Sequence, residues 1–323
     1  MAVKNRNLFR LTRLILLKFP YLFQLLAKFK KPEKKILLIK TDAIGDYILF
    51  RNFLEEVKKA PQYQDYQIDL LGNLIWQEIA TFYDNNYVSH FYFIKAEDLY
   101  HQPLKVLKLG WKLFNQNYAL VLQPSYTRTF INDGLAALTA SKQIIGFEGD
   151  FEGISPQIKK KTDLFYTQKL KLPATSYFEF DRTRFFFETI LQKQITLKGP
   201  FLPVKTSTQN YIAFCLGAGN LKRIWELEKF MALAQLILQH TNYTIFLLGE
   251  ANACDDASFI HKNLSSDRIQ NLVQKTTLLA FINFIAQSAL VICNESSAVH
   301  IAAACGKKAV SVLGGGHFDR FAP

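Results

Sequence analysis

The sequence has few of the residues from which metal centres and disulfide frameworks are built. Its 323 residues include four cysteines, which lie far apart, form no Cys-x-x-Cys pair and have no paired histidines nearby. Cys215, Cys254, Cys293 and Cys305 each fall in or beside an apolar segment, which is typical of buried free thiols in a reducing compartment. We therefore expect no metal site, and nothing in the sequence indicates another cofactor.

Long uninterrupted apolar runs are also missing. Residues 8–29, "LFRLTRLILLKFPYLFQLLAKF", are rich in leucine and phenylalanine, but Arg10, Arg13, Lys18 and Pro20 interrupt them. A transmembrane helix needs about 20 consecutive apolar residues, and the segment has no small-residue cleavage site typical of a secretory signal. Two interpretations stay open: a basic helix that lies in the plane of an anionic membrane surface, or a helix that docks on the protein's own surface.

The common nucleotide-binding glycine motifs are absent. The segment "KTDAIGDYILF" (40–50) leads from an apolar run into a helical pattern, but it holds the single glycine Gly45 and neither Gly-x-Gly-x-x-Gly nor Gly-Lys-Ser/Thr. Its carboxylates, Asp42 and Asp46, would repel a diphosphate, whereas either could accept a proton from a hydroxyl group. Aspartate is also a favoured residue at helix N-caps. The segment alone therefore leaves both roles open, proton acceptor and helix cap.

Acidic residues are scarce relative to basic ones, and the formal net charge is +12. Within the first 35 residues the single acid Glu33 accompanies ten basic residues: Lys4, Arg6, Arg10, Arg13, Lys18, Lys28, Lys30, Lys31, Lys34 and Lys35. Such an excess can attract nucleic acid, anionic lipid or a phosphorylated substrate. Because no recognisable nucleic-acid-reading motif accompanies the basic arm, we expect no nucleic-acid partner.

Short apolar runs alternate with helical patterns along most of the chain. Strands are predicted at 36–40, 66–72, 87–94, 118–124 and 142–147, and again at 211–219, 243–249, 269–274, 290–293 and 308–314. Residues 148–175 lose this alternation, 176–191 read as a helix, and the Pro, Gly, Ser and Thr content of 192–209 predicts a linker. Strands that alternate with helices predict βαβ units and parallel sheets.

We therefore predict an α/β protein with two domains. A basic amphipathic segment (1–35) precedes the first domain (36–191), and the linker (192–209) leads to the second (210–323). The cleft between two such domains, at the carboxyl ends of their strands, is where a ligand is expected.

Three further turns carry chemistry, and each follows a predicted strand. "LGAGNLKRIW" (216–225) places Lys222 and Arg223 after two glycines, where they could neutralise a diphosphate. "CNESSAVHIAAACG" (293–306) begins a helix with polar residues, and helix N-termini favour anions. "LGGGHFDRF" (313–321) would let a ligand approach the backbone closely.

Taken in order, these segments resemble glycosyltransferase family 9, the heptosyltransferases that build the inner core of lipopolysaccharide. The resemblance covers about residues 36–323 and rests on "ILLIKTDAIGDYILFRNFLEEVKK", "ALVLQPSYTRTF…IIGFEG", "LGAGNLKRIWELEKF", "LLGE" and "LVICNESSAVHIAAACGKKAVSVLGGGHF". It implies a GT-B architecture, in which two Rossmann-like domains face each other across a cleft. The first domain would hold the acceptor and the second the nucleotide sugar.

The resemblance also implies roles for individual residues. Asp46 would be the base that deprotonates the acceptor hydroxyl, and Arg223, or Lys222 in its place, would steady the leaving diphosphate. Glu295, Ser296, Ser297 and His300 match the donor-binding turn and the histidine that follows it. Gly45, Ser125 and Arg128 would lie on the acceptor side, with Arg128 meeting a phosphate on a lipid-linked sugar.

The reaction implied is metal-independent, inverting transfer of heptose or a related sugar from ADP-heptose or a similar nucleotide sugar to lipopolysaccharide core or another lipid-linked glycan. The reaction would take place on the inner face of the bacterial inner membrane. The expected partners are therefore the nucleotide-sugar donor, the lipid-linked acceptor and an anionic membrane surface. The alternatives are a different nucleotide sugar or surface-polysaccharide acceptor on the same fold, and a non-catalytic protein that binds a nucleotide sugar.

The sequence departs from the family pattern in three places. Glu295 stands where many members have aspartate, which shifts donor contacts by a methylene, and Ser297 replaces a frequent glycine. No segment follows Pro323 that could form the C-terminal helix that usually crosses back onto the first domain. We expect either that the second domain is truncated or that the N-terminal helix compensates.

Overall fold

The computed structural model describes residues 5–174, 178–314 and 319–321. Its contacts divide the chain into two compact units. The first unit comprises Met1–Asp42, Phe53–Tyr177 and Asp181–Ile195, and the second comprises Ala43–Asn52, Phe178–Phe180 and Thr196–Pro323. Each unit is therefore assembled from segments that are separate in the sequence.

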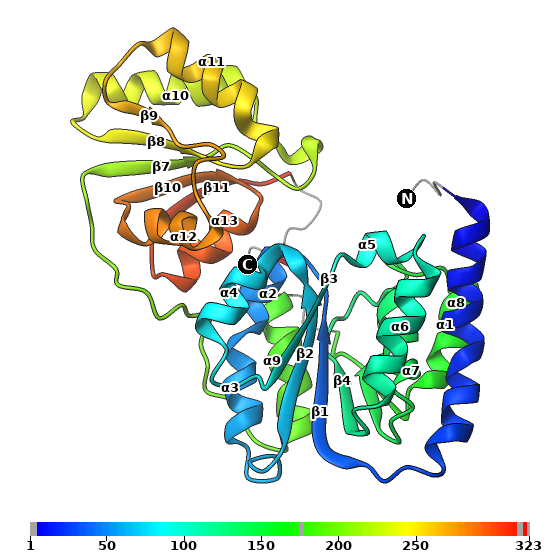
Figure 1. Cartoon of the computed structure of the whole chain (residues 1–323). Coiled ribbons are helices and arrows are strands. Elements are labelled where there is room, and N and C mark those ends of the chain that lie inside the picture. The colour runs from blue at the N-terminus through cyan, green and yellow to red at the C-terminus, as the bar shows by residue number, and fades with distance from the viewer. Residues whose placement is uncertain (1–4, 175–177, 315–318, 322–323) are drawn as a thin grey trace. The chain divides into compact units, whose positions relative to one another are not determined.

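The first unit is built on a parallel sheet of six strands. These are β1 (Glu33–Lys40), β2 (Gln67–Asn73), β3 (His90–Ile94), β4 (Tyr118–Gln123), β5 (Ile144–Phe147) and β6 (Gln168–Leu170). Their order across the sheet is β3-β2-β1-β4-β5-β6, which is the order of a Rossmann sheet (Figure 1). β1 occupies the middle of the sheet, and its apolar run "ILLI" is fully buried, as a central parallel strand requires.

Helices cover both faces of this sheet (Figure 1). They are α1 (Arg6–Ala27), α3 (Asn52–Lys59), α4 (Gln77–Tyr83), α5 (Ala96–Leu99), α6 (Pro103–Phe114), α7 (Phe130–Leu138), α8 (Pro156–Thr162) and most of α9 (Glu179–Leu191), with short 3₁₀ turns η1 (Leu74–Trp76) and η2 (Asp163–Phe165). β6 and α8 fall in the stretch 148–175, where the sequence predicted no regular structure. Both are short and mainly polar, so neither has an apolar periodicity that could reveal it.

The N-terminal helix α1 packs against α6 and α7 (Figure 1). Leu16 is fully buried there, and a Cβ atom added to Gly134 of α7 would lie 2.6 Å from the Leu16 Cβ. This close approach requires glycine at position 134. One of the two interpretations of the segment, docking on the protein's own surface, is thus confirmed. Among the described residues, no helix has the length and apolar character needed to cross a membrane.

The second unit repeats the same architecture with five parallel strands. These are β7 (Tyr211–Cys215), β8 (Thr244–Leu248), β9 (Ile269–Asn271), β10 (Leu290–Asn294) and β11 (Ala309–Val312), in the order β11-β10-β7-β8-β9. Its helices are α10 (Leu227–His240), α11 (Cys254–Leu264), α12 (Leu278–Gln287) and α13 (Ser297–Ala304), with turns η3 (Leu221–Arg223) and η4 (Ala251–Ala253) (Figure 1).

One more helix belongs to the second unit by its contacts. α2 (Ile44–Phe50) follows β1 of the first unit in sequence, yet it packs on α13. Arg51, which follows α2, donates a hydrogen bond from Nη1 to the carbonyl of Phe201 at 2.6 Å. The two α/β folds expected from the sequence are present, and α2 is a segment of the second unit inserted between two segments of the first.

Candidate active site

Each sheet has one position where the strand order reverses, and ligands of open α/β sheets bind at the carboxyl ends of the strands flanking it. In the first unit this position lies between β1 and β4, whose ends lead to Asp42 and Ser125. In the second unit it lies between β7 and β10, whose ends lead to Gly217 and Glu295. The residues singled out from the sequence therefore fall at both reversal points.

In the first unit a lysine, an aspartate and a serine form a closed cluster. Lys40, the last residue of β1, is only 1% exposed, and its Nζ lies 2.8 Å from Oδ2 of Asp42 and 3.4 Å from Oγ of Ser125. The Ser125 hydroxyl donates to the same Asp42 oxygen at 2.6 Å. The Asp42 carboxylate thus neutralises a buried lysine. Sequence reasoning missed Lys40, although a lysine that ends the apolar run "ILLIK" was a visible signal.

The main chain at Asp42 is held in place as well. Its carbonyl accepts a hydrogen bond from Nε1 of Trp76 at 3.0 Å. The Trp76 ring lies over Gly72, where a Cβ atom would come within 1.9 Å of it, so β2 needs a glycine at this point. The turn after β1 is therefore fixed before α2 begins.

Asp46 lies in the first turn of α2 and is half-buried. The N-cap of this helix is Ala43, which makes no side-chain hydrogen bond to it. Neither Asp42 nor Asp46 therefore occupies the N-cap position itself. A carboxylate in a first helical turn interacts favourably with the helix dipole, so the position of Asp46 at the start of α2 is compatible with a carboxylate side chain.

Gly45 brings α2 into direct contact with α13. A Cβ atom added to Gly45 would lie 2.6 Å from Cδ2 of His300, so any side chain at position 45 would force the two helices apart. His300 is buried, and burial lowers its pKa to about 4. The imidazole is therefore neutral near pH 7 and acts as a packing surface. Asp46 is thus one residue away from the contact between α2 and α13.

The turn after β10 is organised by Asn294, which is fully buried. Its Nδ2 donates to the carbonyl of Leu216, at the end of β7, at 2.5 Å, and its Oδ1 accepts from the amide of Trp225 at 2.8 Å. One side chain thus ties together the two strand ends and the loop that carries the cations. Asn294 is therefore a positioning residue, a role that the sequence pattern did not reveal.

Glu295 and Arg223 lie face to face at this turn. Nη1 of Arg223 is 3.6 Å from Oε1 of Glu295, and the amide of Gly314 donates to Oε2 of Glu295 at 3.0 Å. A Cβ atom at Gly314 would lie 3.1 Å from Cγ of Arg223, so glycine lets the loop after β11 close over the pair. Arg223 remains partly exposed, whereas Glu295 is buried.

The other residues expected on the donor side lie at the start of α13 and in the turn before α10. Ser296 is the N-cap of α13, where its hydroxyl oxygen accepts from the amide of Ala298, and Ser297 opens the helix. Lys222 is exposed in the turn before α10. His317 of the glycine-rich turn lies outside the described residues.

Arg128 is enclosed by side chains of its own unit. It is fully buried, and its guanidinium donates from Nε and Nη2 to Asp133 at 3.2 and 2.7 Å and from Nη1 to Asp163 at 2.6 Å. Burial acts to lower the pKa of Arg128, but hydrogen bonds to Asp133 outweigh it and the pKa is raised. The guanidinium stacks on Tyr166 at 4.2 Å. We therefore assign Arg128 a structural role in place of the phosphate contact expected.

The cysteines form no disulfide bonds among the described residues. All four cysteines are free thiols, and burial raises the pKa of Cys293 and of Cys305 to about 11. Within the described ranges, no group of three or more His, Cys, Asp or Glu side chains is arranged to hold a metal ion.

Solved structures that match this fold include heptosyltransferases and another family 9 glycosyl transferase. E. coli heptosyltransferase WaaC with ADP has 18% identity and a TM-score of 0.66, with 86% of each chain covered. E. coli ADP-heptose lps heptosyltransferase II has 17% identity and a TM-score of 0.66, covering 86% of this chain and 84% of that one. A family 9 glycosyl transferase from Veillonella parvula has 14% identity and a TM-score of 0.65, covering 90% and 85%.

Comparison with curated protein sequences gives no match. The sequence model of glycosyltransferase family 9 (heptosyltransferase) matches residues 131–323, which is more than half of the chain and includes the whole second sheet. The structural matches extend further along the chain, because they cover 86% of it, a larger share than residues 131–323 represent. The chain therefore belongs to glycosyltransferase family 9, the heptosyltransferases, and its two parallel-sheet α/β units are similar to those of GT-B heptosyltransferases such as WaaC.

Proposed function

We propose that this protein transfers heptose or a related sugar from an ADP-sugar to lipopolysaccharide core or another lipid-linked glycan. The observation that carries the proposal is the contact between Gly45 and His300, because it joins the helix of the candidate base to the helix of the donor turn. An ADP donor is supported by relatives: WaaC has been solved with ADP and with ADP-2-deoxy-2-fluoro heptose.

The chemistry is a single displacement at the anomeric carbon. Asp46 accepts the proton of the acceptor hydroxyl, the acceptor oxygen forms a bond to the anomeric carbon, and the bond from that carbon to the diphosphate oxygen breaks. ADP leaves with the bonding electron pair. Because the acceptor attacks from the side opposite the leaving group, the configuration of the sugar inverts.

The negative charge that develops on the diphosphate needs compensation. Arg223 supplies it from the loop before α10, with Lys222 next to it, and the amides at the start of α13 add their partial charge. These groups serve where other glycosyltransferases use a metal ion, so we propose a metal-independent reaction. The test is activity that persists in the presence of a chelator.

Glu295 has two functions in this scheme. Through its contact with Arg223 it orients the guanidinium, and its Oε1 has no hydrogen-bond partner among the described residues. A buried carboxylate oxygen without a donor is a suitable acceptor for a hydroxyl of the ribose or the sugar. In this scheme the lipid-linked glycan binds with its attacking hydroxyl group next to Asp46.

A lipid-linked acceptor places the enzyme at a membrane. We propose a peripheral location on the inner face of the bacterial inner membrane, where cytoplasmic ADP-sugars are available. The basic, leucine-rich helix α1 supports this location, since its cations attract anionic lipid.

The direct test supplies ADP-heptose and a heptose-deficient lipopolysaccharide core to the full-length protein. Mass spectrometry of the acceptor is expected to show one added heptose per chain. In cells that lack the protein, the surface glycolipid is expected to lose one heptose. If ADP-heptose binds but no lipid-linked acceptor gains mass, the protein is a nucleotide-sugar-binding protein and the proposal fails.

A further inference from the structure

The docked helix α1 leaves a large apolar strip on its outer side. Thr12, Ile15, Leu16, Pro20 and Phe23 are the side chains that it buries. Spacings of three and four residues place a second apolar set on the opposite side of the helix. Its members are each 37% or more exposed: Leu8, Leu11, Leu14, Tyr21, Leu22, Leu25, Leu26 and Phe29, which follows the helix. A contiguous apolar strip of this size marks an interaction surface.

Cations border this strip. Arg6, Arg10, Arg13 and Lys28 occupy a third face of the helix, between the buried face and the exposed strip, and α1 contains no acidic residue. Lys18 lies within the strip, where its aliphatic stem can stay in apolar surroundings while the ammonium group reaches water. Exposed leucines flanked by arginine and lysine are the pattern of a helix that lies in the interface of an anionic membrane.

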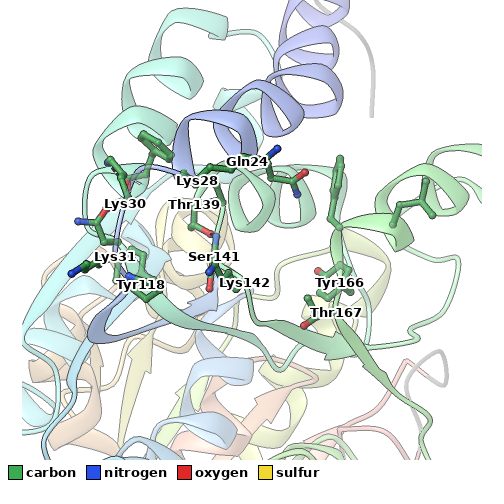
Figure 2. A pocket seen from close by; sticks show the side chains of 17 residues that line it. Gln24, Lys28, Lys30, Lys31, Tyr118, Thr139, Ser141, Lys142, Tyr166 and Thr167 are labelled. Atoms are coloured by element: carbon green, nitrogen blue, oxygen red, sulfur yellow. Dashed lines mark hydrogen bonds between the residues drawn. The ribbon is translucent and has the colours of Figure 1, made fainter.

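A cavity of about 460 Å³ opens at the C-terminal end of the same helix (Figure 2). Its other walls come from segments that precede strands: Lys31 before β1, Asn117 before β4, Ser141 before β5 and Thr167 before β6. The cavity therefore lies at the amino-terminal edge of the first sheet. Lys40, Asp42 and Ser125 lie at the carboxyl edge, so this cavity, which we call the lysine pocket, is separate from the candidate active site.

Four lysines line the lysine pocket: Lys28, Lys30, Lys31 and Lys142 (Figure 2). Lys30 is held in place, because its Nζ donates to the carbonyl of Phe114 at 3.3 Å and to Oδ1 of Asn115 at 3.0 Å. Lys28, Lys31 and Lys142 are exposed and form no ion pair within the described part of the chain. Glu33 lies beside the pocket wall and acts on Lys30, but it is itself paired with Lys35 at 2.8 Å. One carboxylate beside four lysines leaves the pocket with an excess of positive charge.

The lysine pocket also offers one partner for a hydroxyl group. The Thr139, Ser141 and Thr167 side chains line it beside the lysines (Figure 2), but their hydroxyls are already bonded to main-chain groups. Asn117, which also lines the pocket, is different. Its Nδ2 donates to Glu33 at 3.1 Å, while its buried Oδ1 has no partner among the described residues. A buried acceptor without a donor, next to a ring of cations, suits a ligand that has both a phosphate and a hydroxyl group.

The lysine pocket and the apolar strip adjoin each other. Gln24 and Lys28 of α1 line the pocket, and the Tyr21 ring, which belongs to the strip, packs edge-on against Phe165 of the pocket wall at 6.2 Å. Leu164, also on the pocket wall, is 74% exposed. A soluble phosphate would need only the cations, whereas a phospholipid would use both features at once.

We propose that the lysine pocket binds the phosphate-bearing headgroup of an anionic phospholipid while the outer strip of α1 lies in the membrane interface. This inference rests on the membrane location proposed above and adds a defined headgroup site to it. Phosphatidylglycerol fits the chemistry, because its phosphodiester faces the lysines and its glycerol hydroxyls can donate to Asn117.

The test is co-sedimentation of the full-length protein with vesicles of phosphatidylcholine alone or mixed with phosphatidylglycerol. The variant Lys28→Ala/Lys31→Ala/Lys142→Ala removes three exposed cations from the pocket. A matched control, Lys198→Ala/Lys205→Ala/Lys262→Ala, removes three exposed cations from the second unit that do not line the lysine pocket. Each lysine close to an anionic surface contributes about fivefold to binding.

We expect the pocket variant to bind the mixed vesicles about 100-fold more weakly, and the control to stay within about twofold of the unchanged protein. Equal losses in the two variants would show that only net charge matters and would overturn the headgroup site. Calorimetric saturation by millimolar inorganic phosphate, lost in the pocket variant, would overturn the lipid assignment in favour of a free anion. Absence of vesicle binding by the unchanged protein would overturn both the site and the membrane location.

Sugar transfer to a water-soluble acceptor fragment separates this inference from the proposed function. The pocket variant should keep this activity, since the lysine pocket lies at the opposite edge of the sheet from Asp42 and Ser125. If the pocket variant lost activity on the soluble fragment as well, the lysines would serve the reaction itself and the lipid site would be wrong.

Discussion

The turn after β1 and the turn after β10 both follow interior strands of their sheets. The charged side chains of the first turn pair with each other, whereas those of the second are incompletely hydrogen-bonded. After β1, Lys40 is 1% exposed and its contacts with Asp42 and Ser125 close the cluster. After β10, the Arg223 side chain is 30% exposed and stands 3.6 Å from Glu295, whose Oε1 has no hydrogen-bond partner among the described residues. A closed cluster stabilises the fold, whereas an unsatisfied pair has capacity left for a ligand.

The largest effect expected from this comparison is on stability. Lys40→Met leaves the Asp42 carboxylate without its buried partner, so the free energy of unfolding should fall by about 3 kcal/mol. The measurement is urea denaturation. Lys34→Met is the matched control, because Lys34 pairs with Asp65 where the side chains are 67% and 69% exposed, and it should cost less than about 1 kcal/mol. Similar losses in the two variants would show that the Lys40 cluster is not a stabilising unit.

Arg223→Ala tests the turn after β10, where Arg223 faces Glu295. Transfer should fall by about 100- to 1000-fold, because one preorganised donor to the developing charge is lost, while the urea midpoint should change little. The measurements are steady-state kinetics and calorimetric titration with ADP. Lys222→Ala serves as the neighbouring control and should reduce transfer by about tenfold or less. If the two effects are reversed, Lys222 is the cation that meets the diphosphate.

A pH dependence is expected from His300, which links the two helices of the site. Its pKa is about 4 in the folded protein and 6.5 in the unfolded chain. The unfolded chain therefore binds a proton first, so stability is lost as the pH falls from about 6.5 towards 4, by a total of about 3 kcal/mol. Denaturation midpoints measured across this range should fall less steeply for His300→Gln. Parallel curves for the two proteins would contradict a buried, neutral histidine.

Most of the fold could be predicted from the sequence, and the reason is visible in particular elements. Runs such as "ILLIK" and "LVIC" are apolar because central parallel strands are covered on both faces. The edge strand β6, "QKL", buries only Leu170, and α8 buries only Lys159 and Thr162, so neither leaves an apolar pattern. Local periodicity therefore revealed the central strands and most edge strands, and missed the edge strand β6 of the first sheet.

The site was predicted less completely, because its details depend on contacts that are distant in sequence. Motif spacing pointed to Arg223 and Glu295 but could not show that they face each other or that Gly314 donates to Glu295. The same reasoning expected Arg128 at the acceptor. It could not show that Arg128 donates hydrogen bonds to two aspartates that lie 5 and 35 residues further along the chain. The grouping of α2 with the second unit has no local signal at all.

The central claim is that Asp46 is the base of the reaction and Asp42 is part of a structural cluster. The most direct measurement compares Asp46→Asn with Asp42→Asn in single-turnover transfer, together with ADP-sugar binding and stability. We predict that Asp46→Asn loses transfer by about 1000-fold or more with donor affinity and urea midpoint unchanged, while Asp42→Asn loses stability and keeps transfer at low temperature. Full transfer by Asp46→Asn would contradict the account.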